Sequence, residues 1–236
     1  MRYYLAILAL IGYLLHSSLV LAIPMPDEEG DVLFAKKAMS DGFYDLAATR
    51  LQSFLQSHPD SKHKGEVCLL LGKCFYNRGE YKNALYEFEL LKDSLETGDL
   101  AHEAYYWTAE TYFKLKSFES ALENYRKIMD EYSDSPYVPF AHYSAAWCYY
   151  EIGDKLQALE RFDYVVKKYP LESVAAMAEY RISEIFYEEK NYAKARLGLY
   201  NFLKKHPLHD KRQDAYYMLA DSSFQLGEYR DALRNF

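Results

Sequence analysis

The sequence predicts an all-α fold, a right-handed superhelical solenoid of stacked helical hairpins with a 37-residue period. Three observations lead to this prediction. Half of the 236 residues are hydrophobic while only 10 are glycine and 7 are proline, a composition that favours helices. A pattern of small and aromatic residues recurs at 37-residue intervals. Glycine and proline stand at fixed places within this pattern, where they end helices.

The composition also restricts the class of partner. Aromatic residues make up 17% of the chain, so it can bury a core and is not disordered. The formal net charge is −7, and removing residues 1–22 would take away one arginine and no acidic residue, which gives −8. Such a chain lacks the positive field that attracts phosphate backbones and anionic membrane surfaces. The charge therefore disfavours nucleic acid as a main partner.

Residues 1–22 have the pattern of a cleaved secretory signal peptide. Arg2 supplies a positive charge, residues 5–15 form an apolar stretch, and Ala22 ends a small-x-small cleavage pattern. Cleavage would leave Ile23 at the new N-terminus and residues 23–31 as a short acidic leader. We therefore expect export to a bacterial periplasm or envelope. The alternative is an uncleaved anchor, because residues 3–22 are long enough to span a bilayer.

The three cysteines, Cys68, Cys74 and Cys148, are an odd number, which rules out a fully paired set of disulfides. Cys68 and Cys74 lie six residues apart on one expected helix, which places them on different faces. We expect all three to be small buried residues.

The repeat is clearest at small residues on the two helices of each hairpin. The second helix carries an alanine at Ala47, Ala84, Ala121, Ala158, Ala195 and Ala232, each followed four residues later by a large apolar residue. The first helix carries a small residue twelve positions earlier, at Ala35, Gly72, Ala109, Ala146, Ser183 and Ala220. Small residues let two helices approach closely, while bulky side chains fill the groove beside them.

Glycine and proline mark the ends of the helices. Glycine stands between the two helices at Gly42, Gly79, Gly153 and Gly227, and lysine replaces it at Lys116 and Lys190. Glycine permits the left-handed backbone that reverses the chain. Proline closes three copies, at Pro59, Pro170 and Pro207, because it cannot continue a helix.

Each unit is therefore a helical hairpin. The expected helices are residues 29–41, 44–57, 66–78, 81–95, 102–115, 118–132, 139–152, 155–168, 174–189, 192–205, 212–226 and 229–236. Residues 28–236 then hold six repeats, at 28–64, 65–101, 102–138, 139–175, 176–212 and the incomplete 213–236. One hairpin cannot bury both of its faces, so neighbours must stack. A solenoid needs a polar capping end, and the last copy stops inside its second helix, so we expect more repeats or another domain to follow Phe236.

The pattern is similar to the tetratricopeptide repeat, as in Leu71, Gly72 and Phe75 followed by Ala84 and Phe88. The resemblance covers residues 28–236 and implies a superhelix that binds proteins on its inner surface. The unit of 37 residues exceeds the 34 of that family, which indicates a longer connection between repeats. The phrases His58-Pro59 and Tyr169-Pro170, each with a nearby serine, resemble a bacterial envelope subgroup. That subgroup includes the lipoprotein that helps assemble outer-membrane β-barrels and the coordinator of the Tol–Pal cell-division system.

The motif places aromatic and acidic residues on the inner surface, which the first helices form. One row of rings is Tyr106, Tyr143, Tyr180 and Tyr217, and a second is Tyr76, Phe113, Tyr150, Tyr187 and Phe224. Between the rows lie Glu110, Trp147, Glu184 and Asp221, flanked by Lys114, Glu151 and Glu188. Such a lane suits a peptide with apolar anchors and basic side chains, whose backbone the tyrosine hydroxyls would contact. The alternative is that individual rings are core, because aromatic residues at helical spacing are commonly buried.

Enzyme and metal signals are weak. The chain has no G-x-G-x-x-G, P-loop, H-E-x-x-H or EF-hand pattern, so no cofactor is expected. The histidine pairs His58 with His63 and His206 with His209 stand at helix ends beside proline, where we expect solvated histidines rather than metal ligands.

The favoured function is a non-catalytic scaffold of the cell envelope that binds peptide or protein partners. The alternative is the docking arm of a larger envelope or cell-wall enzyme whose catalytic part lies beyond residue 236. Membrane association is expected only through an uncleaved signal or a partner, and self-association through the unfinished end is a weaker third alternative.

Overall fold

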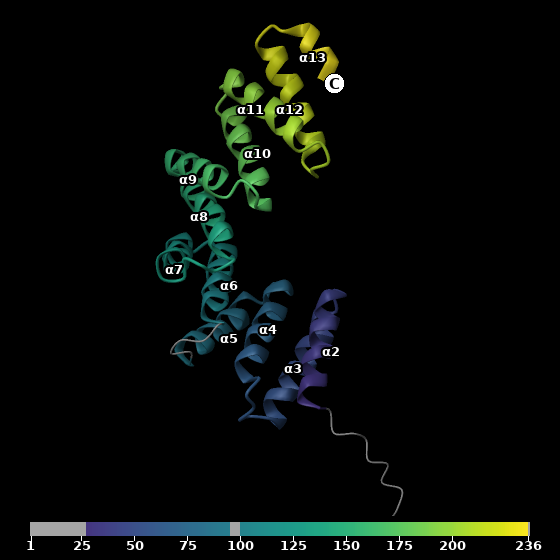
Figure 1. The fold of residues 1–236 in the computed structure, drawn as a ribbon, viewed down its shortest axis with the longest axis vertical. Helices are drawn as coiled ribbons and strands as arrows, with labels where there is room; N and C mark the ends of the chain where they lie inside the picture. The colour runs from purple at the N-terminus through teal and green to yellow at the C-terminus, as the bar shows by residue number, and fades with distance from the viewer. Residues whose placement is uncertain (1–26, 95–99, 236) are drawn as a thin grey trace, which may run out of the picture.

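The computed structural model describes residues 27–94 and 100–235, and these residues form an all-helical solenoid without strands (Figure 1). The predicted signal peptide and residues 23–26 of the acidic leader lie outside the described residues, whereas residues 28–31, which were also expected to belong to the leader, form the first turn of α2. The helices are α2 (Glu28–Ser40), α3 (Tyr44–Ser57), α4 (Lys64–Asn77), α5 (Tyr81–Ser94), α6 (Ala101–Lys114), α7 (Phe118–Glu131), α8 (Val138–Ile152), α9 (Lys155–Lys168), α10 (Ser173–Glu188), α11 (Tyr192–Lys205), α12 (Arg212–Gln225) and α13 (Tyr229–Asn235). Their ends fall within two residues of the sequence expectation, and none of them is long and apolar enough to cross a membrane.

The turn inside each hairpin has one geometry. The four turn glycines have φ between +76° and +93°, the left-handed region in which glycine meets no steric cost. Lys116 and Lys190 adopt the same conformation at φ 60° and 59°, although a side chain is disfavoured there. The repeat register therefore imposes the turn even where glycine is absent.

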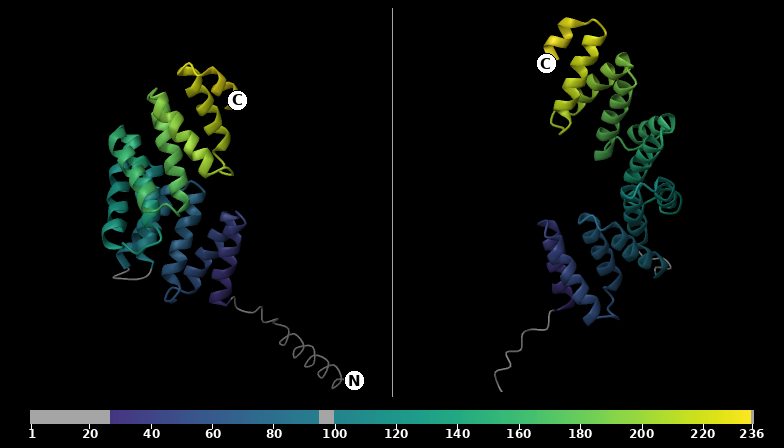
Figure 2. Two further views of the ribbon diagram at one scale, coloured as in Figure 1. Left: turned by 45° about the horizontal axis from the view of Figure 1, so that its top comes forward. Right: turned by 180° about the vertical axis from the view of Figure 1, so that it is seen from behind.

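The hairpins stack with the first helices inward. The backbones of the first helices approach one another in series, from α2 to α4 and onward to α12. The backbones of neighbouring second helices do not, although side chains such as Lys92 of α5 and Asn124 of α7 bridge them. This asymmetry bends the stack into an arc, with α6 and α8 on its inner side and α7 and α9 on its outer side (Figures 1 and 2). The tight inner column explains why the inner surface is the place where side chains of successive repeats meet.

Small residues sit where the repeat pattern predicts close packing. Ala84, Ala121 and Ala158 are fully buried on second helices, and a Cβ added at Gly72 would overlap the ring of Phe88. Four apolar clusters follow one another along the stack. The core is therefore a continuous series of hairpin interfaces, as a solenoid requires.

The three cysteines are free and buried, as predicted. Burial raises the pKa of the Cys68 and Cys74 thiols to about 11 and that of Cys148 to about 12. Their environment keeps them protonated and unreactive.

Candidate binding groove on the inner face

A pocket of about 300 Å³ opens on the inner side between α6 and α8. We call it the inner pocket, and its lining residues are Glu110, Phe113, Lys114, Tyr143, Ser144, Trp147 and Glu151. Four of them, Glu110, Phe113, Tyr143 and Trp147, were predicted from the sequence as partner-binding residues. Three aromatic rings and two carboxylates thus share one concave surface.

The wall of the inner pocket at Trp147 is held by its neighbours. The indole packs edge-on against Tyr150 at 5.4 Å and Phe162 at 6.0 Å between ring centroids. The Arg181 guanidinium, from the next first helix, lies 4.5 Å from the Trp147 ring centroid, a cation–π contact. Arg181 also pairs with Glu184. The ring is therefore fixed in place before any partner arrives.

Glu110 is held at the base of the inner pocket by two hydroxyl donors. The Tyr125 hydroxyl donates to its Oε1 at 2.6 Å and the Ser144 hydroxyl donates to the same oxygen at 2.7 Å. Burial, reinforced by the Glu110 carboxylate, raises the pKa of Tyr125 well above its ordinary value, so this hydroxyl stays a donor. Glu110 is thus a structural acceptor as well as part of the lining.

Tyrosine hydroxyls tie neighbouring repeats together on this face. Tyr150 donates to Glu188 at 2.6 Å, and Tyr187 donates to Asp221 at 2.7 Å. The bond to Glu188, together with burial, raises the pKa of Tyr150 to about 12. The expectation that tyrosine hydroxyls contact a partner's backbone is therefore corrected for these residues, because both hydroxyls already donate across the repeat interface.

A similar tie lies one repeat earlier. The Tyr137 hydroxyl donates to Glu103 at 2.6 Å, and Lys73 pairs with the same carboxylate. Burial opposes ionisation of Glu103, but the hydrogen bonds from Lys73 and Tyr137 outweigh it and hold the pKa of this carboxyl below its ordinary value. Half-buried carboxylates on this face are therefore satisfied internally.

The first predicted row of rings differs along the chain. Tyr106 is half-buried and stacks on Tyr137, with centroids 4.7 Å apart, and Tyr217 is 60% exposed. Tyr143 and Tyr180 are buried, with 8% and 3% exposure, each against a phenylalanine of its own hairpin. The assignment of Tyr180 to an open lane is therefore wrong, because its ring belongs to the core. Tyr143 is mostly core but still lines the inner pocket.

The second predicted row stays at the surface. Tyr76, Phe113, Tyr150 and Tyr187 are half-buried, and Phe224 is 54% exposed. Each of four rings packs edge-on against an aromatic ring of the following helix, as Phe113 does against Phe118 at 5.5 Å. This row therefore supplies the accessible aromatic surface that the sequence predicted.

The acidic residues between the two rows of rings are half-buried and accept hydrogen bonds from neighbouring side chains. Glu184 accepts from Tyr180 at 3.2 Å and pairs with Arg181, while Asp221 accepts from Tyr187. Glu151 lies exposed at the pocket edge. Of the carboxylates lining the inner pocket, Glu151 is thus the more accessible to a basic group of a partner.

A third row escaped the sequence analysis. Trp107, Ser144 and Arg181 occupy one repeat position at 37-residue spacing, directly after the first row of tyrosines. Trp107 packs against Tyr76 at 5.2 Å, Ser144 lines the inner pocket, and Arg181 covers Trp147. Their 37-residue spacing could have identified this row in the sequence. The three side chains differ in chemistry, however, so a pattern of similar residues does not include them.

The histidine pairs are not open loop residues. His206 lies 3.1 Å from a Glu179 oxygen and packs against Phe202, and His58 packs against Phe54 at the end of α3. The expectation of solvated histidines is therefore corrected, because both rings close the end of a second helix. No three His, Cys, Asp or Glu side chains within residues 27–94 and 100–235 gather as a metal site.

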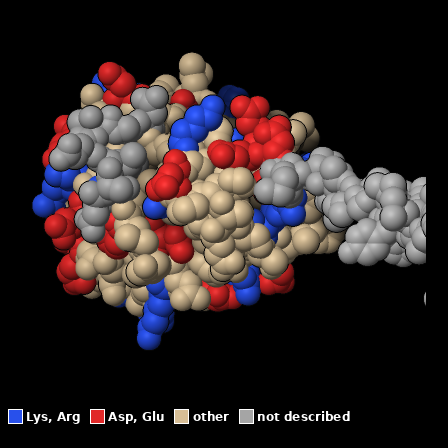
Figure 3. Space-filling model, turned by 90° about the horizontal axis from the view of Figure 1, so that it is seen from below, with Lys and Arg blue, Asp and Glu red and all other residues tan. Residues whose placement is uncertain are grey.

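Charge does not concentrate at the N-terminal end of the stack. Viewed from this end, acidic and basic side chains are interspersed around an uncharged surface (Figure 3). Leu33, Phe34 and Phe43 of the first repeat are large apolar residues that are 69%, 44% and 62% exposed.

Comparison with known proteins gives the class of the chain. Residues 32–95 match the tetratricopeptide repeat family, and residues 99–207 match the tetratricopeptide repeat-like domain. The chain therefore contains tetratricopeptide repeat domains, a class that generally mediates protein–protein interaction. No curated protein matches the sequence.

Solved structures share the fold at low sequence identity. A tetratricopeptide repeat protein from Parabacteroides merdae has a TM-score of 0.64 at 17% identity, over 88% of this chain and 77% of that one. PilF of Pseudomonas aeruginosa has a TM-score of 0.69 at 14% identity, over 87% of this chain and 86% of that one. MamA from Desulfovibrio magneticus RS-1 has a TM-score of 0.62 at 15% identity, over 78% and 97%. These likenesses define the fold alone.

Proposed function

We propose that this protein is a non-catalytic scaffold of a bacterial cell envelope whose inner pocket binds a segment of a partner protein. The observation that carries the proposal is the inner pocket itself. It joins the rings of Phe113, Tyr143 and Trp147 to the carboxylates of Glu110 and Glu151 in one concavity of about 300 Å³. Concave sites with apolar walls and a few placed polar groups are the usual form of binding sites.

The chemistry of the pocket specifies the partner segment. An apolar or aromatic anchor would pack against Phe113 and Trp147, since aromatic surfaces of this kind dominate binding energy. A lysine or arginine beside the anchor would pair with Glu151 at the exposed edge. Lys114 on the opposite helix favours an acidic or carbonyl oxygen next to that base, which gives the segment a direction.

The envelope assignment rests on the signal pattern of residues 1–22, together with the closing phrases at residues 58–61 and 169–173. N-terminal sequencing of protein recovered from an envelope fraction should begin at or next to Ile23. Recovery of Met1 in the membrane fraction would favour the anchor, and Met1 on soluble cytoplasmic protein would overturn export.

Affinity capture from envelope extract tests the binding site. Phe113→Ala and Glu151→Lys change the pocket at half-buried and exposed positions, so the fold should tolerate both. Each should reduce recovery of partners at least tenfold, since such truncations cost about 2 kcal/mol at binding hot spots. The matched control is Glu160→Lys, the same charge reversal at an exposed residue of α9, away from the inner pocket. Equal recovery by all variants would remove the inner pocket from the function.

A further inference from the structure

A groove of about 180 Å³ opens between the second helices α7 and α9, over the first helix α8. We call it the outer groove, because α7 and α9 lie on the outer side of the arc. Its charged and polar lining residues are Arg126 and Asp130 of α7, His142 and Tyr149 of α8, and Arg161 of α9. None of them was predicted as a site residue. Two arginines from neighbouring repeats thus converge on one concavity.

The charged side chains of the outer groove are not paired with one another. Arg126 and Arg161 make no hydrogen bond or ion pair within the described parts of the chain. Asp130 lies one turn after Arg126 on α7, is exposed, and pairs with neither arginine. The groove therefore holds two positive charges and one negative charge, and one further carboxylate would neutralise it.

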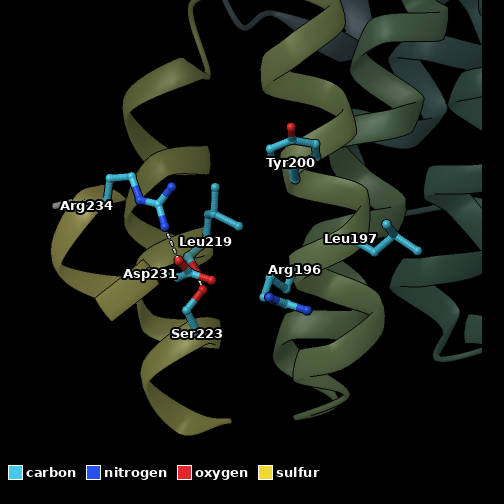
Figure 4. A pocket seen from close by; sticks show the side chains of 7 residues that line it. All are labelled: Arg196, Leu197, Tyr200, Leu219, Ser223, Asp231 and Arg234. Atoms are coloured by element: carbon cyan, nitrogen blue, oxygen red, sulfur yellow. Dashed lines mark hydrogen bonds and ion pairs between the residues drawn. The ribbon is translucent and has the colours of Figure 1, made fainter. Parts of the chain in front are cut away.

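A larger pocket on the outer side shows arginines with partners. It measures about 410 Å³ and lies among α11, α12 and α13 (Figure 4). Arg234 pairs with Asp231 in this pocket, and Arg196 pairs with Glu228. Each of these arginines has a carboxylate within the chain, which the two arginines of the outer groove lack.

The first repeat shows how an arginine at the position of Arg161 is paired inside its own hairpin. Arg50 is the counterpart of Arg161, and its guanidinium lies 2.6 Å from a carboxylate oxygen of Asp31. The counterpart of Asp31 is His142, which is 8% exposed. Burial, together with Arg161, lowers the pKa of His142 to about 4, so the ring is neutral at pH 7. Arg161 therefore lacks the acceptor that its counterpart has.

The corresponding place one repeat earlier, between α5 and α7, contains a carboxylate. Glu89 of α5 lies 2.9 Å from Nζ of Lys92 and 3.5 Å from the hydroxyl oxygen of Tyr112. Nζ of Lys92 also donates to Asn124 of α7 at 3.0 Å. An acidic side chain thus accepts from donors of both layers of helices at this place.

The outer groove has donors at these positions and lacks that carboxylate. The counterparts of Glu89, Lys92, Tyr112 and Asn124 are Arg126, Met129, Tyr149 and Arg161. The Tyr149 hydroxyl has no hydrogen-bond partner among the residues that the structure describes. Met129 and Leu122 add an apolar wall on α7. The groove is therefore a set of donors around a place that a carboxylate occupies one repeat earlier.

We propose that the outer groove binds a glutamate side chain of a partner protein. The carboxylate accepts from Arg126, Arg161 and the Tyr149 hydroxyl, and its methylene groups pack against Leu122 and Met129. Guanidinium groups suit this role, because their planar donors match the two oxygens of a carboxylate.

The charge of the groove favours a carboxylate over a phosphate group. A single negative charge balances the groove, whereas a phosphate group carries nearly two and would meet Asp130 uncompensated. A protein is the favoured source of the carboxylate, since the class of this chain generally mediates protein–protein interaction. The outer groove differs from the inner pocket in its side of the arc and in the charge of its ligand, so it does not rest on the proposed function.

The test is an NMR titration of the full chain that follows the Nε–Hε signals of the arginine side chains. The probe is a five-residue peptide, blocked at both ends, with one central glutamate among glycine and serine. It should shift the signals of Arg126 and Arg161 saturably and bind about tenfold more tightly than its glutamine counterpart. Propionate, which is the glutamate side chain alone, and inorganic phosphate should each bind about threefold more weakly than the peptide at equal ionic strength.

Two variants locate the binding site. Arg126→Glu returns the acidic residue of the preceding repeat and should weaken peptide binding about tenfold, read from the Arg161 signal. Arg126 is exposed, so the fold should tolerate the change. Arg161→Gln should weaken binding about fivefold, read from the Arg126 signal, and Arg126→Glu still decides if this half-buried variant melts early. Arg230→Glu is the matched control, the same reversal at an exposed arginine of α13 outside the groove, and should bind as wild type does.

Four results would overturn the proposal. Unsaturable shifts, or equal affinity for the glutamine peptide, would remove the carboxylate. Binding that persists in Arg126→Glu, or that Arg230→Glu weakens equally, would place the ligand elsewhere. Tighter binding of phosphate would assign the groove to a phosphoryl group. Equal affinity for propionate would assign it to a small carboxylic acid rather than to a protein.

Discussion

The repeat of α8 and α9 and the repeat of α12 and α13 share a register but differ in burial. Their turn glycines, Gly153 and Gly227, have φ of +93° and +79°. Yet Tyr143 is 8% exposed, whereas Tyr217, at the same position of its repeat, is 60% exposed. The cluster around Tyr143 includes residues of α10, the next first helix, whereas α12 is the last first helix described. The register thus determines backbone geometry, and neighbours determine what each side chain does.

The largest expected difference between the two repeats is in stability. Tyr143→Ala should lower the free energy of unfolding by about 3–5 kcal/mol, because it empties a buried aromatic site. Tyr217→Ala should change it by less than about 0.5 kcal/mol, as at most exposed positions. Chemical denaturation of both variants measures the two effects, and equal losses would contradict the comparison.

The next difference concerns pH. His142 of α8 is 8% exposed, and burial together with Arg161 lowers its pKa to about 4, whereas the same position in α12 is Tyr216. The unfolded chain, with the ordinary pKa of 6.5, binds the proton more readily. Stability should therefore be intact above about pH 6.5 and fall as the pH drops toward 4, by at most about 3 kcal/mol.

His142→Phe isolates this contribution, because every other titrating group remains. Between pH 7 and pH 4 the free energy of unfolding of the wild type should fall by up to about 3 kcal/mol more than that of the variant. A constant difference between pH 7 and pH 4 would show that His142 does not titrate in this way.

A third prediction concerns the small position on the first helix, which is Ala146 and Ala220 in the two repeats and Gly72 in an earlier one. Gly72→Ala should cost about 1–3 kcal/mol, because the added Cβ would meet the fully buried Phe88 ring. Gly65→Ala, on the same helix with contacts at 3.5 Å and beyond, is the control and should be neutral or slightly stabilising. Thermal melting of the pair separates overpacking from helix propensity.

The smallest effects test what the two repeats share. Gly153→Ala and Gly227→Ala should each cost about 1 kcal/mol, because both turns need positive φ. Lys190→Gly should stabilise by up to about 1 kcal/mol by relieving the same strain. Unequal losses at the two glycines would mean that the turn geometry depends on neighbours as well.

The sequence predicted the helices and their turns because these follow from local rules. Alanine marks the helix contact in every copy and glycine at positive φ marks the turn in four of the six, so Gly153 and Ala158 could be predicted from spacing. The burial of Tyr180 and the bond from Tyr187 to Asp221 were not, because each depends on the distance between two helices that spacing does not supply.

Ser223 stands where the preceding four repeats carry an aromatic residue, and this departure is visible in the sequence. Its effect on the packing of the helices is visible only in the structure. Sites formed by residues that recur in every repeat can thus be predicted from the sequence, whereas the effect of a residue missing from one repeat requires the structure.

The unequal layers of the arc have a mechanical consequence. The backbones of the inner helices form one contacting column, while those of neighbouring outer helices stand apart and are bridged by side chains such as Lys92 and Asn124. A change in the curvature of this stack would therefore alter mainly the distances between neighbouring outer helices, while the contacts of the inner column are kept. The curvature of the stack is then a quantity that ligands on the outer side can control and that ligands on the inner side can sense.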